Sequence, residues 1–165
     1  MQEFIRGEPI NEVHIERDID ESDTGTIISF LADHTIFDEV NYSFDTMSSR
    51  FREMAFLNAG VRITITDERD NPAHVKSFCY EGGIVSFVQY LNKNKEVLHP
   101  DPIYFCAKRM EDGAETGSVE IAMQYNDGYN EFLLSFANDV RTPEGGMHET
   151  GFKTALTRVL NAYGV

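Results

Sequence analysis

The sequence predicts an α+β fold in two parts, and three features of the chain lead to this prediction. Three stretches repeat apolar residues at steps of three and four, which is typical of amphipathic helices. Several shorter stretches alternate apolar with polar residues, as half-buried strands do. Glycine, asparagine and aspartate gather between these stretches, as expected of turns. We expect a short antiparallel sheet with one helix against it, followed by a three-stranded sheet packed against two helices.

The chain is expected to begin with two short strands around an acidic loop. Residues 13–15 and 26–30 are apolar stretches of strand length, and residues 18–23 separate them. A calcium-binding EF-hand loop requires glycine at its sixth position and glutamate at its twelfth. Asp23 and Ser29 stand at those positions. The loop is therefore interpreted as a solvated acidic turn.

The first helix is predicted at residues 44–57. Asp45 or Thr46 can cap its start, and Gly60 can adopt the left-handed conformation that ends a helix. Its apolar face consists of Phe44, Met47, Phe51, Met54 and Ala55, at helical spacing.

A hairpin is predicted directly after this helix. Val61, Ile63 and Ile65 alternate with polar residues, as expected of a strand with one buried face. A turn cluster at residues 67–72 leads into a returning strand at residues 75–80. These two strands form the sheet against which the first helix is expected to pack.

The second part is expected to begin with a helix at residues 83–91, after the Gly82-Gly83 pair. The sequence Asn126-Asp127-Gly128 is typical of a hairpin turn, because such turns need positive φ angles. It is expected to join the last two of three strands, at residues 103–107, 119–125 and 132–140.

The last helix is predicted at residues 152–163, because Phe152, Ala155, Leu156, Val159, Leu160 and Tyr163 follow the helical period. The helical pattern runs almost to Val165, where the chain stops. We therefore expect the chain to be part of a longer protein.

The composition indicates an acidic globular protein. Of its 165 residues, 41% are hydrophobic and 25% charged, which is enough apolar material for a core. The formal net charge is −14, and no run of Lys and Arg offsets it locally. Because an acidic surface repels phosphate backbones, a nucleic-acid interface within this chain is not expected. The acidity is interpreted as a source of solubility.

Several features favour a cytoplasmic protein. Cys79 and Cys106 are the only cysteines, and each lies in an apolar stretch, so both are expected to be buried free thiols. The longest mainly apolar segment, residues 83–91, is too short to cross a bilayer, and no membrane association is expected. The N-terminus lacks the basic and apolar regions of a signal peptide.

No motif designates a catalytic residue or a metal site. Residues 146–154 resemble a phosphate-binding P-loop, but Phe152 separates the second glycine from the lysine that must follow it. A glycine turn that leads into a helix is the better interpretation. His148 has no second histidine at the spacing that a zinc site requires. No serine or cysteine stands in the motif of a catalytic nucleophile.

Eight stretches of the chain together resemble the B subunit of DNA gyrase, a bacterial type IIA DNA topoisomerase. Each stretch alone is weakly specific, but all eight occur in the family's order along nearly the whole chain. They are residues 2–7, 24–30, 50–61, 80–88, 90–96, 124–129, 135–138 and 144–158.

The resemblance implies a fold and an activity. Residues 1–81 would be the C-terminal part of a GHKL-type ATPase domain, a layered α/β sandwich. Residues 82–165 would be the N-terminal part of a transducer domain resembling domain 2 of ribosomal protein S5. The intact enzyme would supercoil DNA negatively by ATP-driven duplex passage, and this piece would relay nucleotide state to the DNA gate.

The resemblance also implies cofactors and partners. The intact enzyme would use ATP and Mg²⁺, and it would act with the gyrase A subunit on double-stranded DNA. ATP would bring two B subunits together. The general base and the magnesium-holding asparagine would precede residue 1, and a lysine for the γ-phosphate would follow Val165. The isolated chain is therefore expected to be inactive and to hold neither ATP nor metal.

Few site residues can be transferred from the family. Thr26 corresponds to a threonine that holds adenine through a water molecule, and a hydroxyl suits that contact because it donates and accepts. Gly25 would allow close backbone approach, and Ile28 would form part of the apolar wall. Without the family, Thr26 would be interpreted as an ordinary strand residue.

One residue departs from the family pattern. Met147 stands where the family usually has threonine before His148. If that threonine caps the last helix, Thr142 or Glu149 must cap it in this chain.

Two alternatives stay open at this stage. The B-type subunit of topoisomerase IV, a decatenase, shares many of these stretches. A stand-alone α+β interaction module without any nucleotide role is the second alternative.

Overall fold

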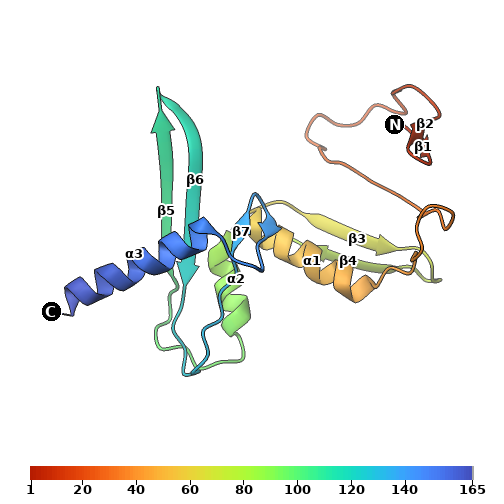
Figure 1. The fold of residues 1–165 in the computed structure, drawn as a ribbon. Coiled ribbons are helices and arrows are strands. Elements are labelled where there is room, and N and C mark those ends of the chain that lie inside the picture. Colours follow the sequence, from red (N-terminus) through yellow and green to blue (C-terminus); the bar gives the residue numbers. More distant parts are fainter. Residues whose placement is uncertain (165) are drawn as a thin grey trace. The chain divides into compact units, whose positions relative to one another are not determined.

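The computed structural model describes residues 1–164, which fall into two compact units that divide between Ser43 and Phe44. In the first unit, β1 (Phe4–Ile5) pairs with β2 (Glu8–Pro9) in a minimal antiparallel hairpin (Figure 1). Arg6 and Gly7 form the turn with positive φ angles of 53° and 84°.

The strands predicted at residues 13–15 and 26–30 are absent from the described first unit, so this prediction is wrong. The side chains of Ile15 and Ile27 are 86% and 93% exposed. A strand requires a neighbouring strand for its backbone N–H and C=O groups, and no described strand pairs with either stretch, although His14 exchanges backbone hydrogen bonds with Met1. Both stretches therefore have the composition of strands but lack the neighbouring strand that a sheet requires.

Short-range polar contacts shape the loops of the first unit. The Asp20 carboxylate accepts hydrogen bonds from the backbone N–H and hydroxyl of Ser22, which lower the pKa of Asp20. Asp33 accepts equivalent bonds from Thr35, and Arg6 Nε donates to Asp33 Oδ2 at 2.7 Å. The pKa of Asp33 is well below its usual range, mainly because of the Thr35 hydroxyl. The acidic loop is thus a self-bonded turn, as interpreted from the sequence.

The second unit begins with α1 (Phe44–Leu57), which packs on an antiparallel hairpin of β3 (Ile63–Asp67) and β4 (His74–Phe78). Both the helix and the hairpin confirm the sequence prediction. Gly60 has a φ of +80°, the left-handed conformation expected of it. In the turn between the strands, the Arg69 guanidinium bonds to Asp67 and lowers the pKa of that carboxyl group to about 2.

The next helix, α2 (Gly83–Asn92), also confirms the prediction and packs against α1. Gly83 begins it with a φ of +55°. A Cβ atom added at Gly83 would lie 3.6 Å from the Cβ of Ala59 and 3.8 Å from the carbonyl oxygen of Phe56. These are ordinary van der Waals distances, so it is the positive φ angle that favours glycine at this position.

Two separate hairpins replace the predicted three-stranded sheet. The first pairs β5 (Ile103–Glu111) with β6 (Ala114–Met123) through a turn at Asp112 and Gly113. The second pairs β7 (Phe136–Ala137) with β8 (Val140–Arg141) through a turn at Asn138 and Asp139. Both turns have two successive residues with positive φ, which matches the right-handed twist of a hairpin.

The three-stranded prediction failed because a different turn closes the hairpin. Asn126-Asp127-Gly128 is not a hairpin turn: Asn126 instead forms an isolated bridge with Val97, and its side chain accepts a hydrogen bond from the Gly128 N–H. The turn at Asp112 and Gly113, where both residues have positive φ, closes the hairpin instead. As a result, β5 runs four residues beyond its predicted end at residue 107.

The last helix, α3 (Met147–Tyr163), begins five residues before the predicted start at residue 152. None of its described residues is buried, so the predicted packing of this helix on the sheet is wrong for the described residues. Gly164 ends the helix, and its N–H donates to the Leu160 carbonyl oxygen at 3.0 Å. Val165, at which the sequence stops, lies outside the described residues.

The two cysteines are less buried than predicted. Cys79 is half-buried and Cys106 is exposed. Cys106 pairs with Glu120 across β5 and β6, on a face of this two-stranded hairpin that no further element covers within the described residues. The prediction of two buried thiols is therefore wrong, because an apolar strand sequence guarantees burial only when something packs on it.

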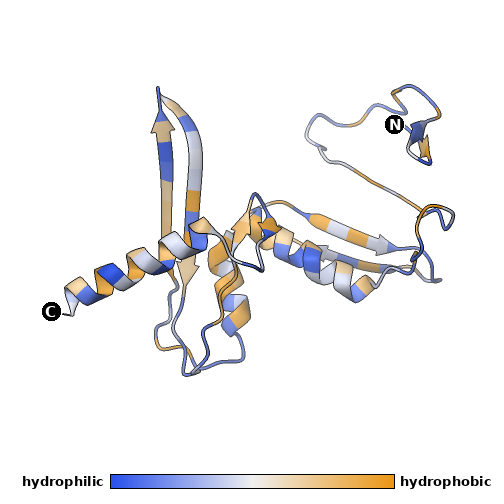
Figure 2. Cartoon of the chain, viewed as in Figure 1, coloured by the Kyte–Doolittle hydropathy of each residue, from blue (hydrophilic) through white to orange (hydrophobic). Residues whose placement is uncertain are grey.

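Along α3, hydrophobic and hydrophilic residues are interspersed (Figure 2). Among the helices of residues 1–164, none combines the length and the apolar character that a membrane crossing requires.

We predict that Ser48→Ala in α1 raises the free energy of unfolding by about 1 kcal/mol, because a buried hydroxyl without a partner costs free energy. Ser48 is 2% exposed, and its Oγ has no hydrogen-bond partner within the described residues. Urea unfolding measures the change. Ser49→Ala, at an exposed position of the same helix, supplies the control for helix propensity. Equal effects of the two substitutions would contradict the prediction.

We predict that Phe56→Ala lowers the free energy of unfolding by about 3–5 kcal/mol, because it leaves a cavity in the small core. Phe56 is 1% exposed. Met54→Ala, on the exposed side of α1, is the control and should cost less than about 1 kcal/mol. If Phe56→Ala does not fold, Phe56→Leu replaces it, and a cost no larger than that of the control would contradict the prediction.

Candidate functional site

The three residues that the resemblance assigns to the adenine pocket lie in the first unit, in a stretch without helix or strand. Thr26 is exposed, and the side chain of Ile28 is 82% exposed. A Cβ atom added at Gly25 would have no heavy atom within 4 Å. The hydroxyl and the apolar side chain suit one edge of a base, but these residues enclose no cavity by themselves. By themselves they present an exposed hydroxyl and an exposed apolar side chain, and no catalytic group.

The described side chains do not form a metal site. Within residues 1–164, no group of three or more His, Cys, Asp and Glu residues is arranged to hold a metal ion.

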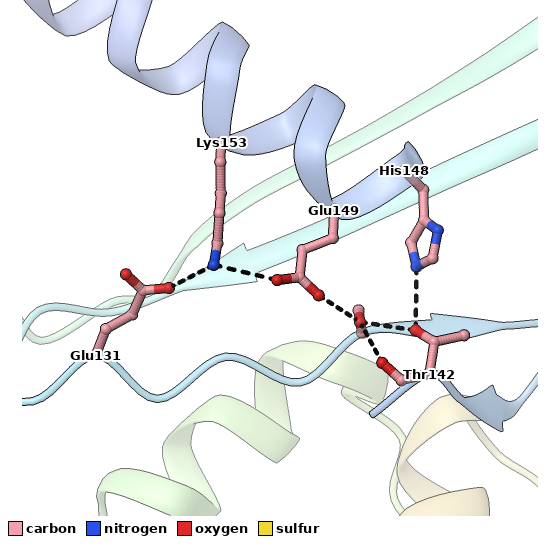
Figure 3. A network of polar contacts seen from close by, with 6 residues as sticks. Glu131, Thr142, His148, Glu149 and Lys153 are labelled. Atoms are coloured by element: carbon pink, nitrogen blue, oxygen red, sulfur yellow. Dashed lines mark hydrogen bonds and ion pairs between the residues drawn. The ribbon is translucent and has the colours of Figure 1, made fainter. Parts of the chain in front are cut away.

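A polar network joins the start of α3 to the β7–β8 hairpin (Figure 3). Ser135, just before β7, donates from its Oγ to Glu149 Oε2 at 2.9 Å. The Oγ of Ser135 lies 2.7 Å from the Oγ1 of Thr142, just after β8. Thr142 Oγ1 in turn lies 3.2 Å from His148 Nε2. The network therefore connects two residues that flank the hairpin with the first turn of α3.

Opposite charges extend this network along the helix. Lys153 Nζ lies 3.1 Å from Glu149 Oε1 and 3.1 Å from Glu131 Oε1 (Figure 3). The Ser135 hydroxyl, followed by the Lys153 ammonium, lowers the pKa of Glu149. The carboxylates of Glu149 and Glu131 raise the pKa of Lys153. Glu149 also lies in the first helical turn, where the helix dipole favours negative charge.

An ionised Glu149 favours one placement of the protons, although the Ser135 hydroxyl also lies 3.2 Å from the Thr142 carbonyl oxygen. Ionised Glu149 can only accept, so the single proton of Ser135 goes to it. Thr142 then donates to Ser135, and His148 must donate to Thr142 from Nε2. The imidazole therefore contacts Thr142 and not the serine, whereas an activated serine nucleophile requires a base in direct contact. This arrangement anchors a helix and does not perform acyl transfer.

An open pocket of about 320 Å³ lies beside the network. Arg141, Glu144 and Gly145 line it together with Ser135, Thr142, Glu149 and Lys153. Its lining is mainly polar, whereas pockets for small organic ligands are mostly apolar. Glu149 and Lys153 already satisfy each other, so the pocket has few free groups to offer a ligand.

Neither Thr142 nor Glu149 caps α3, although the sequence suggested that one of them must. Gly146 occupies the N-cap position, and no side chain bonds to the free N–H groups there. Thr142 and Glu149 are instead engaged with His148 and Ser135. The capping prediction is therefore wrong, because these side chains have nearer partners in the β7–β8 hairpin.

A second assembled feature joins α1 to α2. The ring of Phe56 stacks on that of Tyr80 with centroids 3.6 Å apart, and on that of Phe87 with centroids 4.8 Å apart. The ring of Tyr90 lies 5.4 Å from that of Phe56. Arg52 Nη1 donates to the Tyr90 hydroxyl at 2.7 Å. We call these five residues the helix junction.

Sequence reasoning did not identify Arg52 or the polar network. One available signal was spacing: Ser48, Arg52 and Phe56 follow each other at steps of four, so Arg52 lies on the buried stripe of α1. The network had no such signal, because Ser135 and Glu149 meet only through the fold of the intervening hairpin.

Comparison with known proteins gives one family. The family profile described as DNA gyrase B matches residues 83–165. The B subunit of DNA gyrase from Clostridium acetobutylicum is 53% identical over 145 residues, which are 87% of this chain and 22% of that protein. Its counterpart from Bacillus mycoides is 46% identical over 165 residues, covering 99% of this chain and 39% of that protein. The chain thus spans well under half the length of these relatives.

Solved structures agree with the sequence relatives. The crystal structure of the B subunit of DNA gyrase from Myxococcus xanthus matches with a TM-score of 0.66 and 31% identity, over 77% of this chain and 39% of that chain. The 43K ATPase domain of Thermus thermophilus gyrase B, in complex with an aminocoumarin, matches with a TM-score of 0.61 and 31% identity, over 79% and 34% of the two chains. These matches confirm the mixed α+β fold class.

We predict that Glu149→Gln lowers stability at pH 7 and flattens its dependence on pH below about pH 5. A carboxylate with a depressed folded pKa contributes stability that is present above its unfolded pKa and lost as the pH falls through the folded pKa. Glutamine carries no charge to titrate, so the two stability curves should converge in acid.

Urea unfolding between pH 7 and pH 3 measures this effect. Glu144→Gln is the control, because Glu144 lines the same pocket but lies outside the chain of hydrogen bonds that links Ser135 to Glu149. Parallel curves for wild type and Glu149→Gln would contradict the prediction.

Proposed function

The chain belongs to the DNA gyrase B family, and we propose that in the intact protein it relays nucleotide state from an ATPase domain towards the DNA gate. We place residues 1–81 at the C-terminal end of the GHKL ATPase domain and residues 82–165 at the start of the transducer domain. The observation that carries the proposal is the helix junction. Its Phe56 and Tyr80 precede the proposed boundary, and its Phe87 and Tyr90 follow it.

Rigid packing across this boundary is what a relay requires. The Phe56 ring lies 3.6 Å from that of Tyr80 on its own side of the boundary, and 4.8 Å and 5.4 Å from those of Phe87 and Tyr90 on the other side. Close-packed interiors transmit displacements instead of absorbing them. A shift of α1 would therefore be passed to α2.

The nucleotide contact of this proposal lies in the first unit. Thr26, Gly25 and Ile28 would form one edge of the adenine pocket, with Thr26 bonding the base through a water molecule. Exposed apolar side chains nearby, including Ile27 at 93% and Leu31 at 94% exposure, support the idea that further segments of the ATPase domain cover this stretch. The catalytic and Mg²⁺-holding groups would lie on those segments, so the isolated chain should neither hydrolyse ATP nor bind metal.

The intact enzyme would be an ATP-dependent type IIA topoisomerase, an isomerase that introduces negative supercoils. Its partners would be the gyrase A subunit, double-stranded DNA and a second copy of the B subunit, and it would act in the cytoplasm. The net charge of −14 supports a role for this segment in coupling, with the main DNA contacts made elsewhere. The named relatives are all gyrase B proteins, so the topoisomerase IV alternative is not favoured.

We predict that the chain, extended by the segment that would carry the lysine for the γ-phosphate, associates with a separately expressed N-terminal ATPase segment of a related gyrase B and restores ATP turnover. Binding and turnover are followed together during a titration. Thr26→Val should weaken both, because it removes the hydroxyl that bridges to the base, whereas Thr24→Val in the same exposed stretch should not.

Two results would contradict this proposal. Absence of association, together with cooperative unfolding of the chain alone, would favour a stand-alone interaction module. ATP turnover by the chain alone above a buffer control would contradict the assignment of catalytic groups to other segments.

A further inference from the structure

We infer that Arg52 is a positioning residue for the reaction, the connection through which a movement of α1 is converted into a movement of α2. This inference rests on the proposed relay function and assigns that function to one side chain. Arg52 belongs to α1, on the ATPase side of the proposed boundary, and its hydrogen-bond partner Tyr90 belongs to α2, on the transducer side.

Arg52 contacts three elements at once. Its Nη1 donates to the Tyr90 hydroxyl at 2.7 Å, and both groups are partly buried. Its guanidinium carbon lies 5.1 Å from the ring centroid of Phe78 in β4 and 5.4 Å from that of Tyr90. A guanidinium at these distances is attracted by the negative face of each ring. One planar cation therefore fixes α1, β4 and α2 relative to one another.

The absence of an acidic partner makes this arrangement informative. The chain has 28 Asp and Glu residues, yet within residues 1–164 Arg52 forms no ion pair. By contrast, Arg50 one half-turn away pairs with Glu53 at 3.0 Å. A partly buried cation held by the ring of Phe78 and by the ring and hydroxyl of Tyr90 depends on the position of those two rings. Its interactions weaken as soon as α2 is displaced from α1.

Geometry makes the contact directional. The Tyr90 hydroxyl is a single acceptor at the end of a rigid ring, so sliding of α2 along α1 lengthens the 2.7 Å bond directly. The stacked rings of Phe56, Tyr80 and Phe87 tolerate sliding better, since an offset stack is at least as favourable as a face-to-face one. The aromatic stack thus holds the helices together, and Arg52 fixes their register.

The test uses the full-length gyrase B protein that contains this chain, assembled with its A subunit. Supercoiling and ATP turnover are measured in the same reactions, and their ratio reports coupling. Arg52→Met keeps the length of the side chain but removes its charge and donors. Tyr90→Phe removes only the accepting oxygen. Arg50→Met is the matched control, because Arg50 is an exposed arginine of the same helix.

We expect Arg52→Met to lower the number of supercoils introduced per ATP between about twofold and thirtyfold, the range typical of residues that carry coupling. ATP turnover itself should persist. Tyr90→Phe should act in the same direction, and the double variant should be no worse than Arg52→Met, because both substitutions remove one interaction. Arg52→Lys should rescue part of the loss, since it retains the cation but not the fork of donors.

Three outcomes distinguish the possible failures. An unchanged ratio in a folded Arg52→Met variant overturns the inference and leaves the relay proposal intact. If Arg52→Met does not fold, an unchanged ratio in Tyr90→Phe overturns it equally. A wild-type enzyme that supercoils DNA without any dependence on ATP overturns the relay proposal, and the inference with it.

Discussion

The stacking of Phe56 is the interaction on which the second unit depends. Its ring is 1% exposed and contacts the ring of Tyr80, before α2, and the rings of Phe87 and Tyr90 within α2. Few other apolar side chains are fully buried: Ala55, Phe78 and Phe87 complete the buried core. Because that core is so small, the packing of α1 against α2 depends strongly on this one aromatic residue. The proposed relay function uses this same contact.

Away from this core, the structure is held by polar contacts and by the packing of α2 on β6, where the buried side chain of Asn92 bonds to Gln124 and Asn126. The β5–β6 hairpin closes at a turn with two positive φ angles and needs no covering layer to define its register. The first turn of α3 is joined to the β7–β8 hairpin by a chain of hydroxyl, carboxylate and ammonium groups. Exposed polar contacts of this kind add little stability individually, but they define orientation. The helix junction is therefore the place where we propose that mechanical coupling is concentrated, and the polar network sets the direction in which α3 leaves the hairpin.

Prediction from the sequence was most accurate where the two elements that pack together are adjacent in the chain. The α1 helix and the β3–β4 hairpin are adjacent in the chain, so amphipathic spacing in one and alternation in the other were enough to predict both. It was least accurate where an apolar stretch needed a distant neighbour. Residues 13–15 and 26–30 have strand composition but no pairing strand in their unit, and Cys106 lies on an uncovered face. The adenine-pocket residues Gly25, Thr26 and Ile28 came from family resemblance alone, because nothing in their own spacing indicates a nucleotide.

The sequence by itself determined the family, the α+β class and the three helices, because motif order and hydrophobic periodicity can be recognised in the chain without knowing its fold. The tertiary structure decided which turn closes each hairpin, since Asp112-Gly113 and Asn126-Asp127-Gly128 are equally good turn sequences and only pairing distinguishes them. It also decided the roles of Arg52 and Glu149. Each makes its defining contact with a residue 38 or 14 positions away, and side-chain chemistry alone does not specify a partner at that separation.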